Sequence, residues 1–175
     1  MTRRPYPSRT IRSITLACAA LTTGLMAGIF YAYAVSVNLG LAEQPDASYI
    51  ATMNEINEKI QNPLFFPGFF GAIIFPIIAL VVHLPHRRSG RFRLIFLACA
   101  LYFSGSFLVT VVANIPLNEE LALVATDAPA DELARARAAY EGPWNFWNGV
   151  RSIFSIVAFA AIVGACLLRE DPGAR

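Results

Sequence analysis

Polar side chains recur at helical spacing where the last apolar stretch of the chain begins. Trp144, Asn148, Arg151 and Ser155 fall at positions i, i+4, i+7 and i+11, so a helix that begins by residue 145 carries them on one face. Arg151 then lies one to two turns inside the apolar stretch. A charge at the centre of a bilayer costs roughly 2.5–3.5 kcal/mol on insertion scales, and less near the interface. Such an arginine needs a polar environment or a function.

Two interpretations of Arg151 remain open from its position. Its side chain can extend to lipid head groups, which its depth allows. Alternatively, it faces the interior of a helix bundle beside Asn114, Asn118 and Asn148. A planar guanidinium with three amides forms a site rich in hydrogen-bond donors. Such a site suits the carbonyl or phenolate oxygens of a flat organic molecule.

The sequence offers little for metal or nucleophilic chemistry. His83 and His86 have HxxH spacing, but Pro85 lies between them and no Cys or carboxylate accompanies them. Contact with anionic lipid explains the basic residues around them. The three cysteines lie far apart inside apolar stretches, where they act as small packing residues. We therefore expect no metal site.

The composition defines the class of protein. Of the 175 residues, 56% are hydrophobic and 15% are charged, whereas a soluble domain carries about 25% charged residues. An intrinsically disordered chain is excluded because such chains are poor in apolar residues. A formal net charge of +2 is too small for the electrostatic footprint of a nucleic-acid-binding protein. The chain is predicted to be a membrane protein in contact with the lipid bilayer.

Four apolar stretches reach the length of about 20 residues that spans a bilayer as a helix. They cover residues 13–39, 64–84, 92–113 and 149–168. None alternates with the period of two that a membrane barrel requires. The sequence therefore predicts an all-α, four-helix transmembrane bundle over residues 13–168, between a basic N-terminus at 1–12 and a tail at 169–175.

Basic residues predict the orientation of the bundle. Ten of the 14 lysines and arginines lie before the first stretch, between the second and third, or after the fourth. These are Arg3, Arg4, Arg9, Arg12, Arg87, Arg88, Arg91, Arg93, Arg169 and Arg175. The positive-inside rule places these segments, and therefore both termini, in the cytoplasm. We expect an integral protein of a bacterial cytoplasmic membrane with its two long loops outside.

The first apolar stretch carries a small residue at every fourth position. These residues are Ala20, Gly24, Gly28, Ala32, Ser36 and Gly40. Such a stripe predicts close packing against another helix of the bundle. Residues 32–34 (Ala-Tyr-Ala) resemble a signal-peptide cleavage site, but the apolar run before them exceeds the usual length of about 7–15 residues. We interpret the stretch as a retained helix.

The first outer loop is predicted to contain a helix over residues 46–61, capped by Asp46 or Ser48 and followed by Pro63. Its apolar stripe consists of Tyr49, Met53, Ile56 and Ile60. A polar stripe consists of Asn54, Asn57 and Gln61. This polar stripe is either the solvated face of a helix that lies on the membrane or one wall of an outer pocket.

The second outer loop is predicted to span residues 117–147, with a short helix at about 131–140. Pro116 is expected to end the preceding span at about Ile115. Both tryptophans follow at the end of the loop. Trp147 is predicted to anchor the chain at the membrane interface, where tryptophan is enriched.

Four motifs together resemble a known family of small four-helix membrane proteins, the anthrone oxygenase-like family. The motifs are GLMAGIFYAYAVSVNLGL, MNEINEKIQNPLFFPGFFGA, NIPLN and WNFWNGVR, in this order. The resemblance covers residues 13–165. Characterised members are mainly fungal polyketide-pathway proteins, which oxidise an anthrone to an anthraquinone with molecular oxygen and no recognised cofactor, and much of the family is a domain of unknown function.

The resemblance implies a site at the outer face and a cofactor-independent oxygenase that acts on a phenolic polycyclic or quinol-like substrate. Carried over by motif, the catalytic positions are Arg151, Asn148, Asn114 and Asn118. The substrate-binding positions are Trp144, Asn57 and Asn62. Arg151 and the amides could stabilise negative charge that develops on oxygen.

A general base is missing from this set, because only Glu55, Glu58, Glu119 and Tyr140 are nominal candidates on the outer side. The alternative is a non-catalytic membrane protein that binds a lipophilic small molecule or supports an envelope complex.

Overall fold

Residues 8–168 are described by the computed structural model, and within them every regular element is helical. Four helices are long and apolar enough to cross a membrane: Arg9–Ala42, Phe65–His86, Gly90–Ala122 and Ala130–Leu167. The predicted all-α, four-span bundle is thereby confirmed. The basic N-terminus and the tail were predicted largely on residues 1–7 and 169–175, which lie outside the described residues.

Two of the four columns contain π-helical turns, in which the backbone hydrogen bond spans five residues. The first column is α1 (Arg9–Ala32), π-helical η1 (Tyr33–Val37) and α2 (Asn38–Ala42). After α3 (Asp46–Lys59), the second is α4 (Phe65–His83) and the 3₁₀ turn η2 (Leu84–His86). The third is α5 (Gly90–Tyr102), π-helical η3 (Phe103–Leu108) and η4 (Thr110–Asn114), and α6 (Ile115–Ala122). The fourth column is a single α-helix, α7 (Ala130–Leu167).

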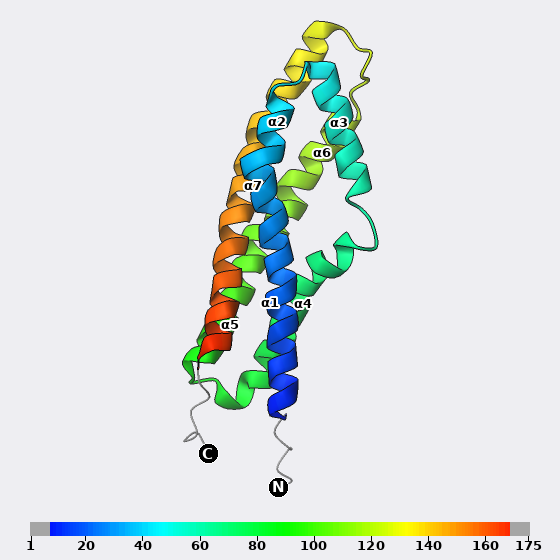
Figure 1. Ribbon diagram of the computed structural model, residues 1–175. Coiled ribbons are helices and arrows are strands. Elements are labelled where there is room, and N and C mark those ends of the chain that lie inside the picture. The colour runs from blue at the N-terminus through cyan, green and yellow to red at the C-terminus, as the bar shows by residue number, and fades with distance from the viewer. Residues whose placement is uncertain (1–7, 169–175) are drawn as a thin grey trace.

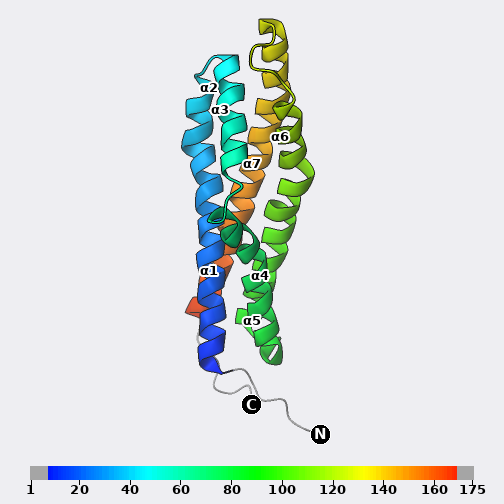
Figure 2. The ribbon, with the colours of Figure 1, turned by 90° about the vertical axis from the view of Figure 1, so that its right-hand side faces the viewer.

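The four columns form an up-down bundle in which α1 packs against α4 and α7, and α5 packs against α7 and α4. Both ends of the described chain and the turn between α4 and α5 lie at one end of the bundle (Figure 1). At the other end, α3 stands beside α2 and α6 rather than across the bundle axis (Figures 1 and 2). We call these the termini end and the α3 end.

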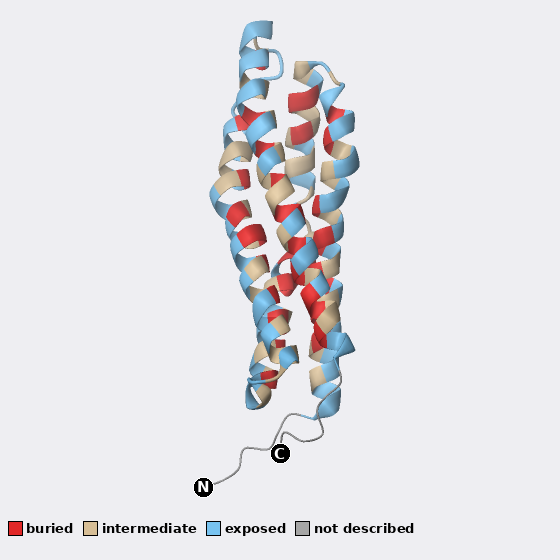
Figure 3. Ribbon diagram, turned by 90° about the vertical axis from the view of Figure 1, so that its left-hand side faces the viewer, coloured by how far each residue is buried: buried red, intermediate tan, exposed pale blue. Residues whose placement is uncertain are grey.

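Column length explains why α3 is needed. The α4–η2 column has 22 residues, which is roughly 33 Å at 1.5 Å per residue and close to the hydrocarbon thickness of about 30 Å. The other three columns have 33 to 38 residues. They continue past the start of α4, and α3 takes the fourth position there. Exposed residues cover the outer surface of the columns along their length, as lipid contact requires (Figure 3).

Two predicted helix ends, at about Ile115 and at about residue 140, are wrong, because both helices continue past them. Pro116 lies in the first turn of α6, directly after η4, and the column continues to Ala122. A proline lacks an N–H, and a π-turn shifts the backbone hydrogen bonds by one residue, so the turn accommodates it. Pro143 lies inside α7, which runs without a break from Ala130. The predicted helix at 131–140 is therefore the first part of the fourth span.

Two local predictions about the first half of the chain also need correction. The helix at residues 46–59 is present, but Pro45 precedes it and no side chain caps it; Asp46 instead accepts a hydrogen bond from Arg137. In the small-residue stripe, Gly24 lies against Phe159 of α7, as predicted. A Cβ at Gly28 or Gly40 would meet nothing within 4 Å, so that half of the stripe faces outward and the packing prediction is wrong there.

Candidate ligand-binding cavity

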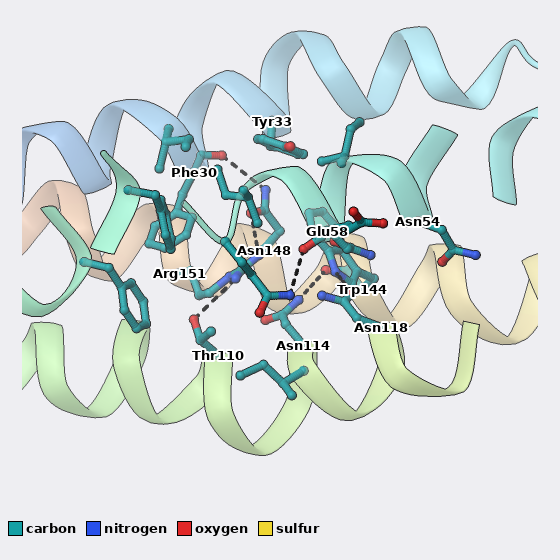
Figure 4. Close-up of a pocket in the computed structure, with 18 of the residues that line it drawn as sticks. Phe30, Tyr33, Asn54, Glu58, Thr110, Asn114, Asn118, Trp144, Asn148 and Arg151 are labelled. Atoms are coloured by element: carbon teal, nitrogen blue, oxygen red, sulfur yellow. Dashed lines mark hydrogen bonds between the residues drawn. The ribbon is translucent and has the colours of Figure 1, made fainter. Parts of the chain in front are cut away.

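A cavity of about 650 Å³ lies at the level where α4 begins. All four columns and α3 contribute side chains to it (Figure 4). Six of the seven predicted site residues line it: Asn57, Asn114, Asn118, Trp144, Asn148 and Arg151. The volume is within the range of small-molecule sites, about 300–1,000 Å³.

Arg151 is buried in the wall of the cavity, with 6% of its surface exposed. Its guanidinium lies 4.5 Å from the centre of the Phe30 ring and 5.2 Å from that of Trp144. Nη2 donates to Asn148 Oδ1 at 3.0 Å and Nη1 donates to Thr110 Oγ1 at 3.3 Å. The side chain therefore faces the bundle interior, and the alternative that it extends to head groups is wrong.

The charge of Arg151 has no counter-ion within the described part of the chain, where no carboxylate lies within 4.0 Å of it. Two of its five N–H groups are used, and Nε is buried without a partner. A buried cation without an anion is unfavourable in a low-dielectric interior. An anionic oxygen in the cavity would complete this site.

Two asparagines beside Arg151 have different surroundings. Both polar atoms of the Asn148 side chain have partners: Oδ1 accepts from Arg151, and Nδ2 donates to the Phe30 carbonyl at 3.2 Å. Asn148 therefore holds the guanidinium in place. Asn114 is 1% exposed, donates to the Trp144 carbonyl at 3.5 Å, and leaves its Oδ1 buried without a partner among the described residues. Asn114 and Arg151 thus offer unused hydrogen-bonding atoms at the same cavity.

Asn118 organises a second polar group one turn further along α6. Its Oδ1 accepts from Trp144 Nε1 at 2.9 Å and from the Tyr140 hydroxyl at 2.8 Å. Asn57 of α3 donates to the same Tyr140 hydroxyl at 3.4 Å. These bonds fix the orientation of the indole, whose face lies against the guanidinium. Asn118 and Asn57 therefore position the ring that forms the cavity wall.

The polar stripe of α3 forms one side of the cavity, since Asn54, Asn57 and Gln61 all line it. This is the pocket-wall alternative of the two that the sequence left open. Asn62 is the predicted site residue that does not line the cavity. Its Oδ1 accepts from the backbone N–H groups of Leu64 and Phe65, at 2.9 and 3.0 Å, and thereby begins α4.

Several cavity residues were not predicted as site residues. Thr110 bonds Arg151, and it precedes Asn114 by four residues, a spacing that places both on one helix face. Phe30 and Tyr33 lie in the motif GLMAGIFYAYAVSVNLGL. An aromatic residue in an apolar span does not indicate whether its side chain faces lipid or the bundle interior. Phe65 and Phe69 give none either, since they belong to a continuous apolar run.

The three carboxylates among the nominal bases form no ion pair with Arg151. Glu55, Glu58 and Glu119 line the outer part of the cavity and are exposed to solvent. The neighbouring Lys59 donates a hydrogen bond to Glu58 and lowers the pKa of that carboxyl, which weakens it as a base. Among the described residues no cluster of three or more metal-ligating side chains occurs.

The fold and the cavity define a class: a four-span helical membrane protein with a buried, uncompensated arginine in an aromatic cavity. A family profile described as Anthrone oxygenase matches residues 64–161, more than half of the chain. The chain therefore belongs to the anthrone oxygenase family, as the sequence motifs indicated. The matched residues include Asn114, Asn118 and Arg151, whereas α3 precedes them. No curated protein and no solved structure matches the chain.

Proposed function

We propose that this protein is a membrane-embedded, cofactor-independent oxygenase that acts on a flat phenolic polycyclic or quinol-like substrate. The observation that carries the proposal is Arg151, buried in a cavity of about 650 Å³ with N–H groups unused and no carboxylate near it. The rings of Phe30 and Trp144 beside it suit a flat aromatic ligand.

The reaction requires little of the protein beyond charge stabilisation. In an anthrone, the CH₂ between two rings is acidic because its anion delocalises onto the carbonyl oxygen. Loss of one proton to water gives that anion, and its carbon reacts with O₂ to form a C–O bond. The resulting peroxide takes up a proton from water and loses H₂O to leave a carbonyl, so that CH₂ and O₂ become C=O and H₂O. Arg151 would stabilise the oxyanion, with Asn148 holding the guanidinium in place.

The second candidate is a non-catalytic protein that binds a lipophilic molecule in the same cavity. It is favoured by the position of the carboxylates: Glu55, Glu58 and Glu119 are exposed at the outer part of the cavity, and none pairs with Arg151. Binding of a lipophilic anion needs Arg151 but no base.

Oxygen consumption with an anthrone in detergent separates the two candidates. The oxygenase proposal expects turnover by the wild type, and a loss of about 10²–10³-fold in rate for Arg151→Ala, the usual effect of removing one oxyanion donor. Arg151→Lys should also be impaired, since an ammonium lacks the planar fork of donors. Saturable binding of the anthrone without any turnover in the wild type would support the non-catalytic candidate.

We also propose that the termini end faces the cytoplasm of a bacterial cell, so that the cavity lies at the outer side of the membrane. Eight of the ten arginines named above lie at or near the start of α1, or around the turn between α4 and α5. That turn and both ends of the described chain lie at the same end of the bundle (Figure 1). Cysteine labelling in intact cells tests this orientation. Glu55→Cys and Asp131→Cys should react with an impermeant maleimide, and Ser89→Cys should not; the opposite pattern would reverse the orientation.

A further inference from the structure

The mouth of the cavity has two chemically different ends. On α6, Ile115 and Glu119 are one turn apart, and both line the cavity while remaining exposed. Phe66 of α4 and Glu58 of α3 also line the cavity and are exposed. The end at Phe66 and Ile115 is apolar, and the end at Glu58 and Glu119 is acidic.

From the length of α4, we place the apolar end at the edge of the hydrocarbon layer. Phe66 is the second residue of α4, the column whose length matches the bilayer. Phe66 and Ile115 are 39% and 40% exposed, as expected of side chains that face lipid. The mouth therefore reaches from the hydrocarbon region to the aqueous side.

Helix packing explains why the mouth opens at this place. α4 packs against α1 and α5, but it makes few close approaches to η3, η4 or α6. Aromatic rings occupy the seam: Phe69 lies 5.5 Å from Phe107, and Phe107 lies 6.0 Å from the exposed Phe103. Phe65, stacked on Phe69 at 5.4 Å, lines the cavity. An aromatic surface thus connects the lipid-facing side to the cavity.

Charge makes the acidic end a poor entrance for an anion. Glu55, Glu58 and Glu119 surround it, and Lys59 pairs with only the first two. An anion that approaches from water meets an excess of negative charge before it reaches Arg151. A neutral molecule dissolved in the bilayer meets no such barrier at Phe66 and Ile115.

We propose that the cavity is loaded from the bilayer: a neutral, weakly acidic, flat aromatic molecule enters between Phe66 and Ile115 and reaches Arg151 without crossing the acidic end of the mouth. Once inside, its O–H ionises, the proton leaves to water at the acidic end, and Arg151 holds the oxyanion. The inference rests on the proposed function for the class of ligand, but it requires binding alone and no turnover.

Entry kinetics of alizarin, a hydroxyanthraquinone that is already oxidised at the ring carbons, test the route. In proteoliposomes of the full chain with Trp147→Phe, Trp144 is the single tryptophan and lines the cavity, so its quenching reports arrival. Ile115→Phe narrows the apolar end, and Glu119→Phe narrows the acidic end one turn away. We expect Ile115→Phe to slow both entry and exit about tenfold, and Glu119→Phe to change them less than about twofold.

The equilibrium dissociation constant should stay nearly constant in Ile115→Phe, because an entrance affects both rates equally. Phe66→Ala widens the same end and should accelerate entry, which gives a second test if Ile115→Phe fails to fold. Slower entry in Glu119→Phe alone, equal rates in all variants, or no saturable quenching in the wild type would overturn the proposal. A protein that binds alizarin through the apolar end but consumes no oxygen with an anthrone would overturn the oxygenase proposal only.

Discussion

The two ends of the bundle solve different packing problems. Towards the termini end, the columns approach closely over small side chains that are fully buried. These are Ala19, Ala72, Ala79, Ala98, Ala158 and Ala165. At the α3 end, a separate cluster of larger side chains, including Tyr49, Met53, Leu121 and Trp144, surrounds the outer side of the cavity. Small side chains let the helices approach closely towards the termini end, whereas large side chains keep them further apart at the α3 end.

The difference shows which forces act at each end. Lipid provides no hydrophobic drive for helix association, so the termini end depends on close van der Waals contact between backbones. The α3 end depends on polar contacts between segments that are far apart in the sequence. Arg137 of α7 is the centre of these contacts, since it pairs with Asp46 at 2.9 Å and with Glu141 at 2.8 Å. It also donates to the carbonyls of Ala42 and Gln44, at 2.8 and 2.6 Å.

The largest effect on stability is expected from Gly105 of η3, where close packing leaves no room. A Cβ at this position would lie 2.0 Å from the Phe154 ring. Gly105→Val should destabilise the bundle by about 1–3 kcal/mol or more through overpacking. The measurement is the thermal midpoint in detergent, with Gly28→Val as the control because a Cβ there meets nothing. Equal midpoints for the two variants would show that the approach of η3 to α7 is not tight.

A smaller, local effect is expected at the α3 end from Arg137→Met. The substitution leaves two carboxylates and two carbonyls without their donor, which we expect to cost on the order of 1–2 kcal/mol for the docking of α3. Hydrogen exchange at residues 46–59 should accelerate while exchange in α4 stays unchanged. Arg135→Met is the matched control, because its pair with Asp131 is 75% exposed and should contribute little. Similar exchange in both variants would contradict the role of Arg137.

The smallest effect is expected from Asn62→Ala. This substitution distinguishes a role of Asn62 in starting α4 from a role in binding a ligand in the cavity. Loss of the two bonds to Leu64 and Phe65 should lower the stability by about 1 kcal/mol, as for other helix caps. The dissociation constant of alizarin should not change, because the side chain does not line the cavity. A marked loss of alizarin affinity at an unchanged thermal midpoint would show that Asn62 contributes to the binding site.

The sequence predicted the elements of this protein because a bilayer imposes strict requirements on it. Apolar stretches of sufficient length must form spans, and the α3 helix followed from its periodicity. The helix end at Pro116 was mispredicted because the proline rule describes an isolated helix, and Pro143 lies inside α7 without ending it. Whether a π-turn or a neighbouring helix accommodates a proline depends on tertiary packing.

For the cavity as well, the sequence determined the local features and the tertiary structure determined the rest. The spacing of Trp144, Asn148 and Arg151 determined that these side chains share one face, since helical geometry is local. Only the tertiary structure decided that this face points inward, that Phe30 and Thr110 complete the surroundings of Arg151, and that Asn62 begins a helix instead. The orientation of a face depends on which helices pack together, and in lipid that choice depends on close contacts between distant residues, such as Gly105 with Phe154.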